Sequence, residues 1–213
     1  MARKTLRNKR SQQRVSSHVQ RARNELRIIG GAWRGRRVKF PDIAAIRPTP
    51  DRVRETLFNW LQHDIAGSRC LDLFAGSGAL GLEALSRGAG HVVFVDRERD
   101  VIEQLSSTLN LLRASGGLLE QRDALRFLEG SPQPFDIVFL DPPFDRDLLP
   151  GVCNALENRG WLTPNALIYL ESPAHGSAPA LPATWTLLKS GRAGEVGYHL
   201  ARRQPSSAPG GTR

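Results

Sequence analysis

The sequence contains few residues of the types that bind metal ions or form disulfides. Of its 213 residues only two are cysteines, Cys70 and Cys153, and both lie in apolar segments at unrelated spacing. The five histidines are scattered without an H-x-x-H motif or a Cys/His cluster: His18, His63, His91, His175 and His199. This pattern favours two buried thiols in a reduced compartment over a disulfide framework or a zinc or iron site. We therefore predict no metal.

Long apolar runs are also missing. No run approaches the ~20 residues that a transmembrane helix needs, and the amino terminus lacks the apolar segment of a secretory signal. A mitochondrial transit peptide would share the basic, acid-poor character of residues 1–24, but apolar residues there are too sparse for an amphipathic helix. We expect a cytoplasmic protein without membrane contact.

Acidic residues are nearly absent from the first 40 positions. That segment carries 13 Lys/Arg and the single acid Glu25, whereas residues 41–213 carry 17 basic and 20 acidic groups. The basic end indicates a polyanionic partner, although composition alone does not separate nucleic acid from an acidic membrane surface. Residues 1–24 are too polar to form a core, and residues 204–213 are rich in Pro, Ser and Gly, so we expect both to be disordered tails.

Residues 25–48 are expected to form a small basic extension. Apolar and basic residues alternate from Leu26 to Phe40 around Gly30-Gly31, which predicts a β-hairpin. Its exposed edge would combine phosphate-seeking cations with a stacking ring, as nucleic-acid surfaces do. The candidate contacts are Arg27, Trp33, Arg34, Arg36, Arg37 and Lys39. The alternative is a basic edge that merely prevents aggregation between sheets.

A helix is expected to follow, with Thr49 as its cap and Pro50 in its first turn. Its packing face would consist of Val53, Leu57, Trp60 and Leu61. Three arginines at its start could meet a substrate or simply be solvated: Arg47, Arg52 and Arg54.

From residue 69 strands and helices alternate. Apolar runs at 70–74, 91–96, 118–122, 135–140 and 166–170 predict strands, and amphipathic segments between them predict helices, including one at 146–158. Segments 185–189 and 196–200 predict an antiparallel hairpin around Gly191 and Gly194. The fold class is therefore α/β, a doubly wound, mostly parallel sheet spanning residues 49–203 as one domain.

Acids stand at the ends of four successive strands: Asp72, Asp96, Asp123 and Asp141. After the first strand, Gly76 to Gly81 match G-x-G-x-x-G, with Asp96 twenty positions after Gly76. A dinucleotide dehydrogenase must therefore be considered. However, the chain has no room for a substrate domain, and Asp72 suits an ammonium or sulfonium better than a pyrophosphate.

The segment Asp141-Pro142-Pro143-Phe144 ends the fourth of these strands. Two prolines remove backbone N–H donors, which leaves the carboxylate and nearby carbonyls as acceptors in a rigid bend. These acceptors can hold a planar amino group while Phe144 stacks on its ring. A plain strand end is the alternative. Guanine N2, adenine N6, cytosine N4 or a glutamine amide would all fit this geometry.

The strand-end motifs resemble those of S-adenosylmethionine-dependent amino-methyltransferases, on residues 72–78, Asp96 and residues 141–144. More narrowly, residues 27–36, 47–49 and 51–61 resemble the bacterial family that methylates guanine N2 in 16S ribosomal RNA, and the resemblance covers roughly residues 26–202. It implies a seven-stranded Rossmann-like methyltransferase sheet and S-adenosyl-L-methionine as cofactor. The implied partner is 16S rRNA within the 30S subunit or an assembly intermediate, and we expect a monomer.

The resemblance also implies roles for individual residues. The catalytic group would be Asp141, Pro142, Pro143 and Phe144. The cofactor would be bound by Asp72, Phe74, Ala75, Gly76, Ser77, Gly78, Asp96, Arg97, Asp123 and Ala124. The RNA would contact the hairpin residues together with Arg47 and Arg52. Two other functions stay open from the residues alone, a DNA adenine-N6 methyltransferase and a noncatalytic RNA-binding assembly factor.

Overall fold

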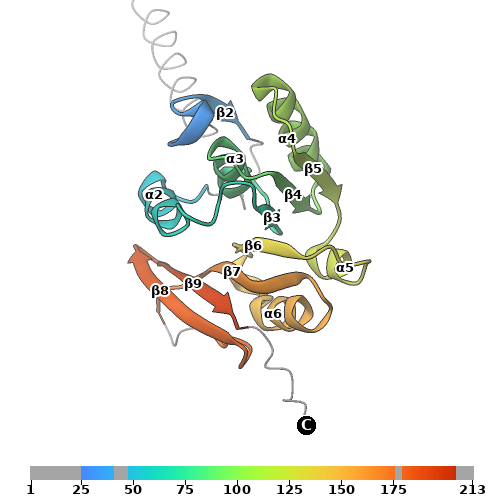
Figure 1. Ribbon diagram of the computed structural model, residues 1–213. Helices are drawn as coiled ribbons and strands as arrows, with labels where there is room; N and C mark the ends of the chain where they lie inside the picture. Colours follow the sequence, from blue (N-terminus) through green and yellow to red (C-terminus); the bar gives the residue numbers. More distant parts are fainter. Residues whose placement is uncertain (1–24, 41–47, 176–178, 205–213) are drawn as a thin grey trace, which may run out of the picture.

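A single sheet of seven strands organises the protein (Figure 1). The computed structural model describes residues 25–40, 48–175 and 179–204. The strand order is β5-β4-β3-β6-β7-β9-β8, in which β3 to β7 run parallel and β8 and β9 run antiparallel. The sheet strands are β3 Arg69–Asp72, β4 His91–Asp96, β5 Gly117–Gln121, β6 Phe135–Leu140, β7 Leu162–Pro173, β8 Trp185–Ala193 and β9 Val196–Arg203. The predicted fold class is confirmed.

Helices cover both faces of this sheet (Figure 1). They are α2 Asp51–Trp60, α3 Ala79–Ser86, α4 Arg99–Leu112, α5 Ala124–Leu128 and α6 Leu149–Asn158. Strand β6 shows how its residues divide between the faces. Phe139 packs in the cluster formed with α2, α3 and α4, whereas Val138 and Leu140 pack in the cluster formed with α5 and α6. Because neighbouring residues of a strand point to opposite faces, a fully apolar run is what a strand covered on both sides requires.

The amino-terminal hairpin packs on the α2/α3 face. It consists of β1 Glu25–Arg27 and β2 Arg37–Lys39, antiparallel, with Leu26 opposite Val38 and both side chains buried. The predicted hairpin is therefore confirmed. Its connection differs from the predicted Gly-Gly turn, because residues 28–36 form a longer loop that contains the 3-10 helix η1, Gly31–Trp33. A short strand pair cannot bury both its apolar faces alone, so the loop packs onto α3 instead.

Close contact with α3 explains the glycines and the tryptophan of this loop. The Ser86 hydroxyl donates to the Gly30 carbonyl at 2.6 Å and accepts from the Trp33 backbone N–H at 2.9 Å. Gly31 has φ +72°, and a Cβ there would lie 1.8 Å from the Ser86 carbonyl oxygen. Trp33 is partly buried against the core. Part of its ring stays exposed, so the predicted contact of Trp33 with RNA stays a prediction.

Three local predictions also need correction. Helix α2 begins at Asp51 and has no side-chain cap, because the N-cap position is Pro50, which has no side-chain acceptor; Thr49 is instead buried near Glu171. Residues 144–146 form the 3-10 helix η2, Phe144–Arg146, so α6 begins only at Leu149. Gly191 lies within β8, and only Gly194, at φ +58°, turns the last hairpin.

Both cysteines are free and buried, as predicted, and burial raises the pKa of each thiol to about 12. Among the residues that the structure describes, no helix is long and apolar enough to cross a membrane. The same residues contain no cluster of three or more His, Cys, Asp or Glu that could hold a metal ion.

Candidate active site

The glycine turn between β3 and α3 is held by two of the predicted acids. The Asp72 carboxylate accepts from the Gly81 backbone N–H at 2.9 Å, and Asp96 accepts from the Gly76 N–H at 2.9 Å. Gly76 and Gly78 have φ +48° and +75°, a conformation that favours glycine. The turn is therefore fixed between the ends of β3 and β4, with Gly76 partly exposed and Gly78 packed closely against Leu105.

The other predicted cofactor residues lie in the neighbouring loops. Asp123 caps α5 by accepting from the N–H groups of residues 125 and 126, at 3.0 and 3.3 Å, and Ala124 beside it is buried. Ala75 and Ser77 are buried in the turn, and Phe74 is partly buried. Because β5, β4 and β3 are neighbours in the sheet, the structure places the ends of all three strands side by side.

Arg97 differs from this group, because its guanidinium pairs with Glu98 at 2.9 Å on the exposed surface. Asp96 still has a partly exposed carboxyl whose second oxygen accepts from the Glu98 N–H at 2.9 Å.

The Asp-Pro-Pro-Phe segment follows β6, which lies between β3 and β7. Strand β6 ends at Leu140, as predicted, and Asp141 comes next. Pro142 is buried, Pro143 is exposed, and the Phe144 side chain is 41% exposed although it is a large apolar group. An exposed phenyl ring beside a carboxylate and a proline carbonyl is the arrangement expected for holding a planar amino group.

A third acid, Glu171, lies near Asp72 and Asp141. Burial raises the pKa of Asp72 to about 7, with the Gly81 hydrogen bond opposing the shift. Burial, followed by the charges of Glu171 and Asp72, raises the pKa of Asp141 well above its ordinary value. Burial also raises the pKa of Glu171, although the Tyr169 and Thr49 hydroxyls donate to its carboxylate. These shifts indicate a site that is short of positive charge.

Glu171 was not among the predicted site residues, although the sequence contains a signal for it. It follows the apolar run ending at Leu170, just as Asp141 follows Leu140. Arg54 was also missed. Its side chain is fully buried, and it donates to the Thr49 and Arg27 carbonyls and pairs with Glu83. Its place beside Val53 and Leu57 on the packing face of α2 was the available signal.

The predicted RNA contacts form an exposed basic surface on the hairpin, with exceptions. Arg34, Arg36 and Lys39 are exposed, as is Arg52 on α2. Arg27 pairs with Asp51 at 3.1 Å, and Arg37 pairs with Glu25 at 3.5 Å. Both arginines stay more than half exposed and can still contact a phosphate. Arg47 lies outside the described residues.

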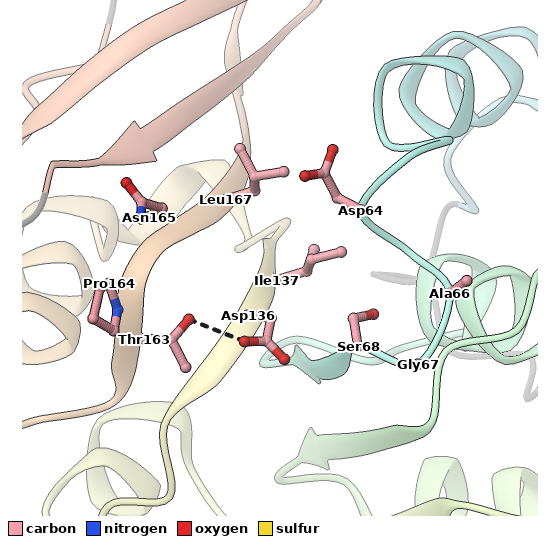
Figure 2. A pocket seen from close by; sticks show the side chains of 10 residues that line it. All are labelled: Asp64, Ala66, Gly67, Ser68, Asp136, Ile137, Thr163, Pro164, Asn165 and Leu167. Atoms are coloured by element: carbon pink, nitrogen blue, oxygen red, sulfur yellow. Dashed lines mark hydrogen bonds between the residues drawn. The ribbon is translucent and has the colours of Figure 1, made fainter.

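A separate cavity of about 360 Å³ lies at the opposite edge of the sheet (Figure 2). It is lined by Asp64, Ala66, Gly67, Ser68, Asp136, Ile137, Thr163, Pro164, Asn165 and Leu167. Asp136 is held there by the Thr163 hydroxyl at 3.0 Å and the Arg69 backbone N–H at 2.9 Å. None of the predicted site residues lines it. Ligands of open α/β sheets bind at the carboxyl ends of the strands, so the acids of β3, β4 and β6 define the candidate site.

Comparison with known proteins shows the family to which the chain belongs. Residues 26–202 match the family described as Conserved hypothetical protein 95. The ribosomal RNA small subunit methyltransferase D of Escherichia coli K12 is 49% identical over 84% of this chain and 91% of its own length. That of Haemophilus influenzae is 47% identical over 84% of this chain and 94% of its own length.

Solved structures include that of the Escherichia coli protein yhhF. It has 49% sequence identity and a TM-score of 0.80 over 84% of this chain and 98% of that one. The family match spans the hairpin and the sheet together, including all four strand-end acids. The chain belongs to the ribosomal RNA small subunit methyltransferase D family.

Proposed function

We propose that this protein transfers a methyl group from S-adenosyl-L-methionine to the exocyclic N2 of a guanine in 16S rRNA of the small ribosomal subunit. The observation that carries the proposal is the adjacency of two devices at one edge of the sheet. The glycine turn with Asp72 and Asp96 forms a cradle, and the Asp141 motif lies on the next strand. The names of the relatives supply the substrate class, ribosomal RNA.

The residues present fit this cofactor. Asp72 is a buried acid that no described Lys, Arg or His pairs with, so it can receive the ammonium of the methionine end. Asp96 offers a partly exposed carboxylate for ribose hydroxyls, and Asp123-Ala124 border the position of the adenine edge. The remaining residues around the cofactor would be Phe74, Ala75, Ser77 and Arg97. When bound, the cofactor supplies an electrophilic methyl group on a sulfonium.

The chain's own residues prepare the nucleophile. An exocyclic amine is a weak nucleophile because its lone pair is delocalised into the ring, and stacking hides it, so the base must leave the helix. The Asp141 carboxylate and the Pro142 carbonyl accept the two N–H bonds and direct the lone pair toward the methyl group for in-line transfer. The exposed ring of Phe144 stacks on the base and fixes its plane. The proton then leaves during or after transfer.

The hairpin provides the surface for the RNA backbone. Its exposed cations contact phosphates without reading sequence. Its loop is bonded to α3, the helix that follows the glycine turn, so a phosphate contact there positions the RNA relative to the cofactor.

The test measures methyl incorporation from labelled S-adenosylmethionine. Wild-type protein is supplied with 30S particles, naked 16S rRNA or DNA, and the product nucleoside is identified by mass spectrometry. N2-methylguanosine in either ribosomal substrate is the expected result, and Asp141→Ala is the matched control for contaminating activity. N6-methyladenine in DNA would contradict the proposal. RNA binding without any labelled product would favour the noncatalytic assembly factor.

A further inference from the structure

Glu171, at the carboxyl end of β7, is a buried acid without a cation. The residue is 3% exposed, and its contacts are the Tyr169 hydroxyl at 2.8 Å and the Thr49 hydroxyl. The other deeply placed glutamates differ, because Glu83 pairs with two arginines and Glu157 with one. Within the described part of the chain, no Lys, Arg or His pairs with Glu171. Burying an unpaired carboxylate is unfavourable, so packing alone does not account for it.

Its position is set by the register of the sheet. Strands β6 and β7 run parallel, with Phe139 opposite Tyr169 and Leu140 opposite Leu170. The next positions are Asp141 and Glu171, and both fall on the α2/α3 face, as Phe139 and Tyr169 do. Neighbouring strands lie about 4.8 Å apart, so the two carboxyl groups can reach adjacent atoms of one planar ring. The charge of Glu171 contributes to the raised pKa of Asp141, as this proximity requires.

Two acceptors side by side select among the nucleobases. In guanine the N2 amine adjoins the ring N1–H, so two neighbouring positions are donors. In adenine and cytosine the amine adjoins a ring nitrogen that carries a lone pair. A second carboxylate next to the amine-binding group therefore attracts guanine and repels the other two bases. A site that hydrogen-bonds a substrate N–H discriminates strongly against an analogue that lacks it.

We propose that Glu171 is a specificity-determining residue that accepts the N1–H of the target guanine while Asp141 and Pro142 hold its N2 amine. The Tyr169 and Thr49 hydroxyls fix the carboxylate, which has about four acceptor sites and retains capacity for a further donor. Thr49 lies two residues before Asp51, the first residue of α2, so the start of this helix would close the side of the base pocket that reads N1. This inference rests on the proposed function, because it assigns a further residue to the same site.

The experiment changes the edge of the substrate base that carries N1–H. The methylated guanine is first mapped, and RNA carrying 2-aminopurine at that position is then assembled into the particle that serves as substrate. 2-Aminopurine keeps the N2 amine but has a lone pair in place of N1–H and a hydrogen in place of O6, so the Glu171 variant described next is needed to assign the loss to N1. Wild-type protein should methylate it about 10- to 100-fold less efficiently in kcat/KM, the loss expected for a missing hydrogen bond to a charged group. Equal efficiency on the two substrates would overturn the inference without any variant being made.

Glu171→Gln then tests the residue itself. Its amide can donate to the N1 lone pair, so the preference for guanine over 2-aminopurine should shrink about ten-fold. Glu129→Gln, which makes the same chemical change at an exposed glutamate after α5, is the matched control and should retain the preference. A Glu171→Gln variant that slows equally on both substrates would show a purely structural role and refute the assignment. Absence of N2-methylguanosine with wild-type protein on guanine would instead refute the proposed function.

Discussion

Buried acids occur in two regions of this protein with opposite surroundings. Under the hairpin, the fully buried Glu83 accepts from Arg54 at 3.4 Å, Arg87 at 2.8 Å and the Ile29 backbone N–H at 3.0 Å. At the carboxyl edge of the sheet, the buried Asp72 and the partly exposed Asp141 have raised pKa values and no pairing cation among the described residues. The paired acid joins elements of the fold. Under the proposed function, the unpaired acids would face a ligand that brings positive charge or N–H donors.

Helix α3 connects the two regions. Gly81 near its start donates its backbone N–H to Asp72, and Glu83 and Ser86 further along hold the hairpin loop. A helix of eight residues is short enough to transmit position as a rigid unit. The basic hairpin and the cofactor cradle are therefore held in a fixed relation.

Removing a cation that pairs with the buried Glu83 should have the largest effect on stability. Arg54→Met leaves Glu83 buried with one cation fewer and frees the Arg27 carbonyl, so the free energy of unfolding should fall by about 3–5 kcal/mol. Urea denaturation followed by circular dichroism measures it. Arg52→Met, on the exposed side of the same helix, is the control and should change stability by less than about 0.5 kcal/mol. Similar midpoints for the two variants would show that the buried pair is not needed.

Replacing an acid that has no pairing cation should instead lower turnover. Asp141→Ala removes a positioned acceptor and should lower kcat by about 10²–10³, or roughly 2.7–4 kcal/mol. Asp141→Asn should keep part of the activity through its amide oxygen, and both variants should bind cofactor normally by calorimetry. Their stability should not fall, because an acid without a cation is removed. Equal and complete loss in both variants would favour an obligatory proton acceptor, whereas near-normal turnover of Asp141→Ala would exclude this site.

The same comparison explains what could be predicted from the sequence. Asp72, Asp96 and Asp141 each end an apolar run, so a local pattern located them at one edge of a parallel sheet. The surroundings of Arg54 depend on Glu83, 29 positions away, and no local pattern reports such a pairing. The position of Arg54 on the packing face of α2 indicates burial, but its partner Glu83 is known only from the fold.

Corrections at the hairpin have the same physical origin. Thr49 fits the preferences of a helix cap, but Glu171 provides a tertiary partner for its hydroxyl more than 100 residues later. Trp33 fits a fully exposed stacking position until α3 is known to lie beneath the loop. Tertiary partners override local preference where two elements meet, and these elements meet next to the site.

The pH dependence of cofactor affinity should follow Asp72. Its pKa in the folded protein, about 7, lies above the ordinary value of 3.8, so its ionisation destabilises the cofactor-free protein as pH rises through about 7. A cofactor ammonium favours the ionised acid, so affinity should rise with pH and be about ten-fold weaker at about pH 5.5 than at about pH 7. Amino groups remain protonated over this window.

Calorimetry at the two pH values tests this prediction. Asp72→Asn should bind weakly at both, with the difference abolished, because no carboxyl titrates there. Asp64→Asn, an exposed acid lining the opposite cavity, should keep the wild-type dependence. Wild-type affinity that is independent of pH would mean that Asp72 does not face the positive end of the cofactor.

The smallest effect, a change in the salt dependence of RNA binding, should come from the exposed cations of the hairpin. Unlike Arg54, these cations do not pair with a buried acid. Arg34 and Arg36 are exposed, so each would contact one phosphate and contribute about 0.7–0.9 to the slope of log affinity against log salt. The double variant Arg34→Gln/Arg36→Gln should flatten that slope by about 1.4–1.8 in RNA-binding titrations without changing the methylated product. Arg159→Gln, at the exposed end of α6 on the other face of the sheet, is the charge-matched control and should leave the slope unchanged. An unaltered slope in the double variant would show that the RNA backbone contacts another surface. Losing phosphate contacts reduces the number of counterions released on binding, so it must flatten the slope.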